Sequence, residues 1–343
     1  MKKILNTLYI TTPDRWLSLD GENIVISEHG NDIGRVPLHN LESVVAFGSV
    51  GATPALMGKC AEDNIELYFM SRSGKFLCSV CGEINGNVLL RREQFRIADD
   101  EKRSLEIAKS MITGKLFNSR YSLERTLRDH ALRIDTAKFE EKSAYLLNAA
   151  RNCQGVSSKD NLRGIEGEAA SVYFSVFDDM ILQQKSEFHF TTRSKRPPLD
   201  NVNALLSFAY TLMASMCTSA LYAAGLDPFV GFMHTDRPGR RSLALDLQEE
   251  FRAVICDRFV LNLINKKQIS DKDFDKREDG AVLLNDNGRK VFLAAWQSYK
   301  QEEIMHPFIK EKVQRGMLPF VQALLLARYI RGDLDCYPVF LWK

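Results

Sequence analysis

The feature of this sequence that most restricts its fold is a change in hydrophobic period near residue 99. Before it, short runs of β-branched and aromatic residues at 24–26, 44–47 and 65–70 alternate with turn residues, a pattern typical of strands. After it, apolar residues recur three and four positions apart, as in amphipathic helices. We therefore expect an α+β protein, with a small β-rich domain at 1–97 and a larger all-α domain at 98–343.

Local signals refine this division of the chain. The strand pattern continues through 76–80 and 87–90, and Thr53-Pro54 indicates the start of a short helix. Polar stretches at 155–159 and 271–280 are expected to be loops, and the second, which is charged at nearly every other position, is expected to be poorly ordered.

Composition indicates a soluble, cytoplasmic protein, with 45% hydrophobic and 26% charged residues. The start of the chain lacks the pattern of a secretory signal. The most apolar run, 205–230, is interrupted by Ser, Thr and Asp, so it predicts a buried helix and no membrane span. Seven scattered cysteines suit a reducing compartment with free thiols.

One cysteine pair, Cys78-x-x-Cys81, has the spacing of half a zinc site. No second pair or nearby His completes four ligands. Two cysteines at the end of a strand are the favoured interpretation, with a structural zinc site as the alternative.

Glu166 is the first residue with a chemical interpretation. It lies between Gly164 and Gly167 at the opening of a predicted Ala- and aromatic-rich helix, three residues before Ala169 on the apolar stripe. We expect these glycines to let the backbone pack closely. A carboxylate on such a stripe needs a cation or a partner, because burying it alone is costly. Taken by itself, the segment favours a capping or salt-bridged Glu.

A second segment places His234 between an apolar run and a basic loop that contains Pro and Gly. Asp246 and Glu249 follow three residues apart on a predicted helix, which puts both carboxylates on one face. One His with two or three carboxylates is a hard ligand set that suits Mg²⁺ or Mn²⁺ better than zinc. Alone, the His is more typical of a satisfied structural residue.

Basic residues lie next to these candidates, although the net charge of the chain is only +2. Guanidinium groups match the geometry of phosphates, so metal and arginine together indicate phosphodiester chemistry. The candidates for DNA contacts near the site are Arg163, Lys195, Arg196, Arg237, Arg240 and Arg241. They are expected to contact phosphates and not bases.

Together these segments resemble the CRISPR-associated endonuclease and integrase family, the "Cas-one" proteins of the spacer-acquisition complex. The residues that carry the resemblance are 164–167, 196–198 with 203–207, 231–234 and 245–252, which fall in family order at family-like intervals. The chain as a whole also looks similar to the subtype I-C branch. The resemblance implies metal ligands at Glu166, His234 and Glu249, with Asp246 as a supporting acid that could exchange duties with Glu249. Many members have Asp where this chain has Glu249.

The same resemblance implies partners and a reaction. Members form homodimers, here through the β-rich domain, that flank a dimer of a small ferredoxin-fold protein and hold a short DNA fragment. The 3′-hydroxyl of that fragment attacks a phosphodiester at the edge of a CRISPR repeat, with no covalent enzyme intermediate. In the I-C branch a RecB-like nuclease that trims the fragment ends is also implied.

Two other functions remain open at this point. A plain metal-dependent DNA nuclease would use water in place of the 3′-hydroxyl, and the ligands do not separate the two reactions because the metal-assisted attack is the same. A non-catalytic DNA-binding scaffold, in which Glu166, His234 and Glu249 are structural, is the second alternative.

Overall fold

The computed structural model of this chain describes residues 7–10, 12–41, 43–63, 65–70, 76–80 and 88–342. They fall into two compact units. The first contains the described residues among 1–85 together with 272–275 and 283–302, and the second contains 86–271, 276–282 and 303–343. Nothing in the sequence pattern predicts that 272–275 and 283–302 belong to the first unit. The predicted domains 1–97 and 98–343 stay a prediction.

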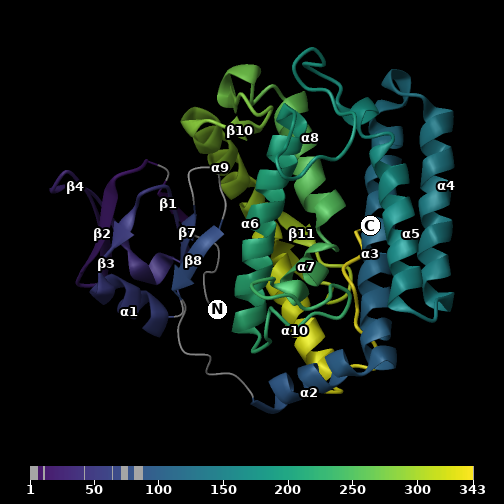
Figure 1. Cartoon of the computed structure of the whole chain (residues 1–343), viewed down its shortest axis with the longest axis horizontal. Coiled ribbons are helices and arrows are strands. Elements are labelled where there is room, and N and C mark those ends of the chain that lie inside the picture. Colours follow the sequence, from purple (N-terminus) through teal and green to yellow (C-terminus); the bar gives the residue numbers. More distant parts are fainter. Residues whose placement is uncertain are drawn as a thin grey trace. The chain divides into compact units, whose positions relative to one another are not determined.

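The first unit is built on two four-stranded sheets (Figure 1). One has the order β1-β5-β7-β8, with β1 (Thr7–Ile10), β5 (Ser43–Phe47) and β7 (Glu66–Met70) parallel and β8 (Phe76–Val80) antiparallel to β7. The other has the order β4-β3-β2-β6, from β2 (Arg15–Asp20), β3 (Asn23–Glu28), β4 (Asn31–Pro37) and β6 (Gly51–Ala52). Gly30, with φ of 84°, lies in the tight turn between β3 and β4.

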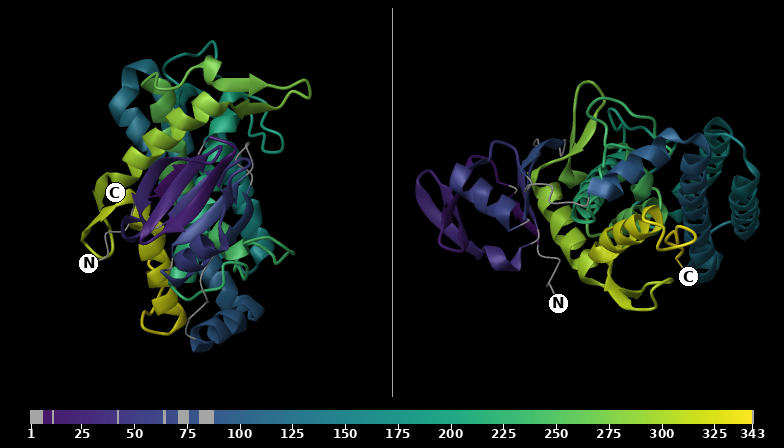
Figure 2. Two further views of the ribbon diagram at one scale, coloured as in Figure 1. Left: turned by 90° about the vertical axis from the view of Figure 1, so that its left-hand side faces the viewer. Right: turned by 90° about the horizontal axis from the view of Figure 1, so that it is seen from below.

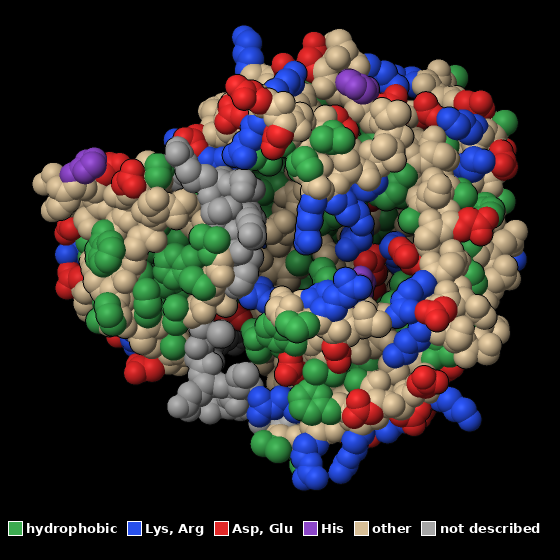
Figure 3. Space-filling view, viewed as in Figure 1, with side chains coloured by type: hydrophobic (Ala, Val, Ile, Leu, Met, Phe, Trp, Pro, Cys, Tyr) green, Lys and Arg blue, Asp and Glu red, His purple; other side chains and the backbone are tan. Residues whose placement is uncertain are grey.

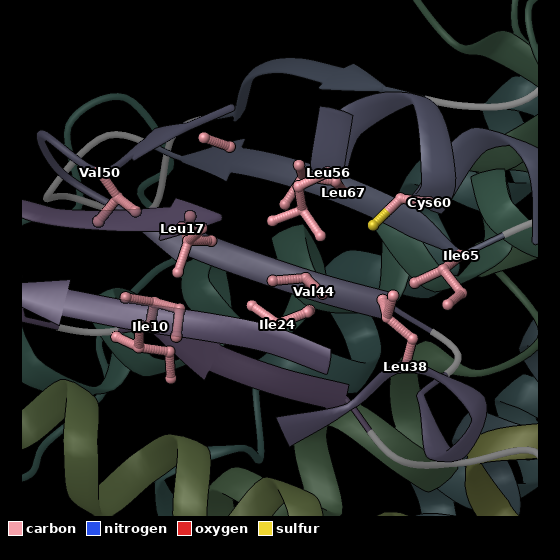
Figure 4. Packing of buried hydrophobic residues seen from close by; sticks show 13 residues of the cluster. Ile10, Leu17, Ile24, Leu38, Val44, Val50, Leu56, Cys60, Ile65 and Leu67 are labelled. Carbon is pink, nitrogen blue, oxygen red and sulfur yellow. The ribbon is translucent and has the colours of Figure 1, made fainter. Parts of the chain in front are cut away.

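The core of this unit lies between strands of both sheets and α1 (Pro54–Glu62), as Figure 4 shows. Leu17, Ile24, Val44 and Leu67 are fully buried there. The side chain of Thr53 caps α1, so the helix predicted after Thr53-Pro54 is confirmed. A second helix, α9 (Asp286–Gln301), also belongs to this unit.

Cys78 is exposed on β8, and Cys81 lies outside the described residues, so the zinc half-site stays untested.

The second unit is mostly helical, as the change of period predicts. Three long helices, α3 (Glu101–His130), α4 (Thr136–Asn152) and α5 (Lys159–Phe174), lie side by side in Figures 1 and 2. Each begins at a side-chain cap, namely Asp100, Asp135 and Ser158. The remaining helices are α2 (Val88–Asp99), α6 (Asn201–Ala223), α7 (Ser242–Gln248), the π-helix η5 (Arg252–Asp257), α8 (Arg258–Asn265) and α10 (Leu318–Ile330).

Helix α6 is the helix predicted from the most apolar run. Asp200 caps it by accepting a hydrogen bond from the Asn203 backbone N–H at 2.7 Å. By length and composition α6 could cross a membrane, but 61% of its most apolar window is buried inside the protein. This is the pattern of a core helix.

Three local predictions are wrong. The run 87–90 is not a strand, because α2 begins at Val88; a short apolar run does not separate helix from strand. Residues 271–280 are ordered, because β9 (Phe274–Lys276) and β10 (Val282–Leu284) pair. The helical part also contains a second hairpin of β11 (Glu303–Met305) and β12 (Lys312–Gln314).

Candidate active site

The candidate site lies in the helical unit, where α3, α5, the 231–241 loop and the end of α7 approach one another. Glu166 lies in the middle of α5 and not at its opening, because the helix already begins at Lys159, seven residues before it. Glu249 follows the last residue of α7. Figure 3 shows Lys and Arg side chains around a hollow near α6 and α7, with acidic and His side chains inside it.

The two glutamates meet at one cation, Lys115 of α3. Its Nζ contacts Glu166 Oε1 and lies 2.8 Å from Glu249 Oε2. Glu166 is partly open, with 27% of its side chain exposed, whereas only 5% of the Glu249 side chain is exposed. The predicted need of Glu166 for a cationic partner is therefore met in this structure by an ammonium group.

Glu249 has a second cationic partner, because Arg252 Nη2 lies 3.1 Å from its Oε1. Burial alone would raise the pKa of Glu249, but Arg252 and then Lys115 outweigh it and lower the pKa to about 2. The carboxylate is therefore ionised at any physiological pH. Its Oε2 is buried and has the Lys115 ammonium nearby, but no donor among the described residues is aligned for a regular hydrogen bond.

Asp246 positions the His234 ring through a hydrogen bond to Nδ1. Asp246 is fully buried, and its Oδ1 lies 2.6 Å from His234 Nδ1. Because a carboxylate oxygen accepts, Nδ1 donates to Asp246, and Nε2 is the ring nitrogen left to face a ligand. Among the described residues no hydrogen bond to Nε2 is found. The His234 side chain is 28% exposed.

Asp246 also fixes the backbone that carries the His. Its Oδ2 accepts from the N–H groups of Phe232 and Met233 at 2.6 and 2.9 Å, and its Oδ1 accepts from the His234 N–H at 2.9 Å. All of these contacts point toward the 231–234 loop. Asp246 and Glu249 are therefore engaged with different partners, the loop in one case and Lys115 with Arg252 in the other.

Gly231 allows this loop to approach α7. A Cβ at this position would lie 2.7 Å from Ser242 Cβ and 2.9 Å from Asp246 Oδ2. Gly164 and Gly167 differ, because a Cβ on either would meet nothing within 4 Å. The expectation that they allow close packing within the chain is wrong; they leave the face of α5 beside Glu166 open.

Arg252 packs against a group of aromatic and charged side chains. Its guanidinium lies over the Tyr210 ring at 5.0 Å, and that of Arg193 lies over the same ring at 5.3 Å. Tyr210 and Tyr173 donate to the two oxygens of Asp257 at 2.6 and 3.1 Å. Burial raises the pKa of Asp257 to about 6, against the lowering effect of these hydrogen bonds.

The predicted DNA-contact residues are placed in four ways. Arg163 donates to the Met233 carbonyl at 3.1 Å and so ties α5 to the His234 loop. Lys195 has two other cations nearby: desolvation lowers its pKa, and so do the charges of Arg252 and Arg193. Arg196 and Arg237 are exposed, while Arg240 and Arg241 are half-buried at the loop's end. All six belong to the helical unit.

The described residues contain no group of three or more His, Cys, Asp or Glu side chains already placed to hold a metal ion. The donor set nevertheless fits a divalent cation. Both glutamates converge on one positive charge, a buried oxygen of Glu249 lacks an aligned donor, and the Nε2 atom of His234 has no hydrogen-bond partner among the described residues.

Sequence reasoning missed Lys115, Tyr210 and Asp257. A signal for Lys115 exists, since it follows Met111 and Ile112 by four and three positions and so falls on the buried stripe of α3. A lysine on such a stripe needs an acidic partner. The acids that satisfy it lie 51 and 134 residues away, and only the tertiary fold identifies them.

Comparisons with known proteins match these features to one family. The model of the family described as "CRISPR associated protein Cas1" matches residues 8–298. A protein named CRISPR-associated endonuclease Cas1 1, from Chlorobaculum tepidum, is 50% identical over 343 residues and is covered completely, as is this chain. A Cas4 exonuclease/Cas1 endonuclease fusion from Geobacter sulfurreducens is 36% identical over 340 residues, which make up 98% of this chain and 60% of the fusion.

Solved structures share the fold. A CAS1 protein from Thermotoga maritima has a TM-score of 0.81 at 22% identity, covering 99% of this chain and 100% of that one. A casposase bound to integration product has a TM-score of 0.84 at 21% identity, covering 99% and 95%. A Cas6-RT-Cas1–Cas2 complex includes a chain with a TM-score of 0.81 at 23% identity, covering 98% of this chain and 36% of that one.

Proposed function

Because this chain belongs to the CRISPR associated protein Cas1 family, we propose that it is a metal-dependent DNA integrase that joins the 3′-hydroxyl ends of short DNA fragments into a CRISPR repeat array. The observation that carries the proposal is the convergence of Glu166 and Glu249 on one cation, within electrostatic reach of His234. Relatives are named endonucleases, and a protein of the same fold has been solved as a casposase bound to integration product.

Glu166, Glu249 and His234 would hold the metal, Mg²⁺ or Mn²⁺. When bound, it would polarise the scissile phosphate and stabilise the charge that builds on it. Asp246 orients the His234 ring from its buried position. Arg252 lies on the Tyr210 face and keeps Glu249 ionised. The metal-binding role therefore goes to Glu249, and the supporting role to Asp246.

DNA binding would rest on the exposed cations near the site. Arg196 and Arg237 are free to reach phosphates, whereas Arg163 already donates to the Met233 carbonyl. Affinity for DNA is expected to fall steeply as salt rises, because each neutralised phosphate releases a counterion.

The partners of the chain are also part of the proposal. We infer a homodimer, a small ferredoxin-fold partner and, if the chain is of subtype I-C, an end-trimming RecB-like nuclease. The Cas4/Cas1 fusion and the complex of Cas1 with Cas2 among similar proteins support such an assembly.

The test is product analysis with a matched set of variants. The protein, with its small partner, is incubated with a free-ended duplex and a supercoiled repeat-containing plasmid in Mg²⁺ or Mn²⁺. Joined product is expected, and Glu166→Ala, His234→Ala and Glu249→Ala should each abolish it while folding and DNA binding persist. Plasmid that is only nicked or hydrolysed would favour a plain nuclease, and joining that survives all three substitutions would favour a scaffold.

A further inference from the structure

Lys115 occupies the position between the two proposed glutamate ligands. Its ammonium contacts Glu166 Oε1 and lies 2.8 Å from Glu249 Oε2. The side chain is only 11% exposed, so this contact is not one of many loose surface pairs. Lys115 is not itself a metal ligand, because an ammonium group has no lone pair to give to a metal ion. Its role at the site therefore needs another explanation.

The charges around the two carboxylates already balance without a metal. Glu166 and Glu249 carry two negative charges, and Lys115 and Arg252 carry two positive charges within ion-pair distance. A divalent cation bound to the same carboxylates would add two positive charges beside the ammonium. The ammonium and the metal therefore compete for the same carboxylate oxygens.

We propose that Lys115 is a built-in competitor for the divalent metal: it bridges Glu166 and Glu249 in the metal-free protein and must be displaced when the metal binds. The inference rests on the proposed function, because it takes Glu166 and Glu249 as metal ligands. Arg252 does not play the same part, since in the described ion pairs it reaches only one of the two glutamates, Glu249, through Oε1.

The bridge sets the metal concentration at which the site fills. Apparent affinity falls by the fraction of molecules that are competent to bind, so a bridge formed in about nine-tenths of molecules raises the apparent Kd about tenfold. The same bridge keeps the glutamates together before metal arrives. Lys115 is therefore a positioning residue for the empty site and a barrier to filling it.

The test measures Mn²⁺ binding to the full chain without DNA, by electron paramagnetic resonance of free Mn²⁺. Lys115→Met removes the charge and keeps most of the side-chain length, and Lys115→Arg keeps the charge. Lys195→Met is the matched control, because Lys195 is also close enough to act on the charge of Glu249 but forms no ion pair with it among the described contacts. Glu166→Ala identifies the site.

We expect Lys115→Met to tighten the Mn²⁺ Kd about tenfold, with Lys195→Met changing it less than about threefold and Lys115→Arg staying near wild type. Circular dichroism confirms folding, and Lys115→Gln replaces Met if that variant does not fold. Binding by Lys115→Met alone also supports the proposal.

Two results overturn it in distinguishable ways. If wild type binds Mn²⁺ and Glu166→Ala does not, but Lys115→Met and Lys195→Met behave alike or Lys115→Met binds more weakly, the competitor role is wrong and the metal site stands. If neither wild type nor Lys115→Met binds Mn²⁺, the metal site itself is wrong and the competitor role falls with it.

Discussion

Replacing Asp246 by Asn is the sharpest perturbation of the site that the structure offers. The buried carboxylate accepts four hydrogen bonds, from three consecutive backbone N–H groups and from His234 Nδ1. Asn has the same shape but only one accepting oxygen, so its amide NH₂ must face donors. If the amide NH₂ takes the Oδ2 position, the N–H groups of Phe232 and Met233 both lose their acceptor. If it takes the Oδ1 position, the His234 N–H loses its acceptor, and the ring keeps a hydrogen bond only by carrying its proton on Nε2 instead of Nδ1.

The expected cost follows from the number of contacts. A hydrogen bond to a charged group contributes about 1.5–3 kcal/mol, so losing one or two predicts a decrease of about 1.5–6 kcal/mol in the free energy of unfolding. Because Asp246 is fully buried, water does not replace the lost partners. The free energy of unfolding of a folded protein is only about 5–15 kcal/mol, so the variant should be measurably less stable than wild type.

Urea unfolding followed by circular dichroism measures this cost, with Asp236→Asn as the control. Asp236 is exposed in the same loop, and its substitution should change stability by less than about 0.5 kcal/mol. In the folded fraction, the freed His234 ring should weaken Mn²⁺ binding about 10–100-fold. A loss of less than about 1 kcal/mol, or one equal to that of Asp236→Asn, would refute the hydrogen-bond reasoning.

Three further outcomes are expected. Gly231→Ala should lower stability by about 1–3 kcal/mol in urea unfolding, because its Cβ would press on Ser242 and Asp246; a neutral effect would contradict this. The pKa of Asp257 is raised from 3.8 to about 6, so the folded protein holds this proton to higher pH than the unfolded chain does. The free energy of unfolding should therefore fall as pH rises between about 4 and 6, by up to about 3 kcal/mol at 1.36 kcal/mol per pKa unit. Asp257→Asn should flatten that part of the pH profile of unfolding, and an unchanged slope would assign it to other groups. Glu250→Ala should release the C-terminal tail to limited proteolysis, because Glu250 accepts hydrogen bonds from three donors on α10 and the tail, and equal protection in both proteins would argue against that anchor.

The sequence predicted the larger features of the fold because these depend on local periodicity. The change of period near residue 99 predicts strands before it and helices after it, and the helix expected after Thr53-Pro54 begins there. Errors occurred where local signals are short. The run at 87–90 is too brief to separate helix from strand, and the hairpin at 274–284 is specified by pairing between segments that look like a polar loop.

The candidate site was predictable by residue type but not by arrangement. Glu166, His234 and Glu249 could be identified as a hard ligand set, because that chemistry is visible in single residues. Which acid faces the cation depends on the turn of the chain after α7, which no periodicity encodes. Lys115 was missed for a related reason: its acidic partners come from other helices.

The neighbouring residues Glu249 and Glu250 face different surroundings, and their pKa values shift in opposite directions. Glu249 faces Lys115 and Arg252, and its pKa is about 2, while Glu250 is buried against Tyr337, Gln322 and the Phe340 N–H, and burial raises its pKa to about 7. The turn at the end of α7 and the π-helix η5 that follows set this division.

This makes the length of the segment as important as its composition. Each added or removed residue in a helix turns everything beyond it by about 100°. A single insertion after Gln248 would therefore put the inserted residue beside Lys115 and Arg252, and would move Glu249 into the place of Glu250 and Glu250 into the place of Phe251. An insertion or deletion there is expected to remove Glu249 from Lys115 and Arg252 and Glu250 from the tail at once, whereas a substitution removes the contacts of one side chain only.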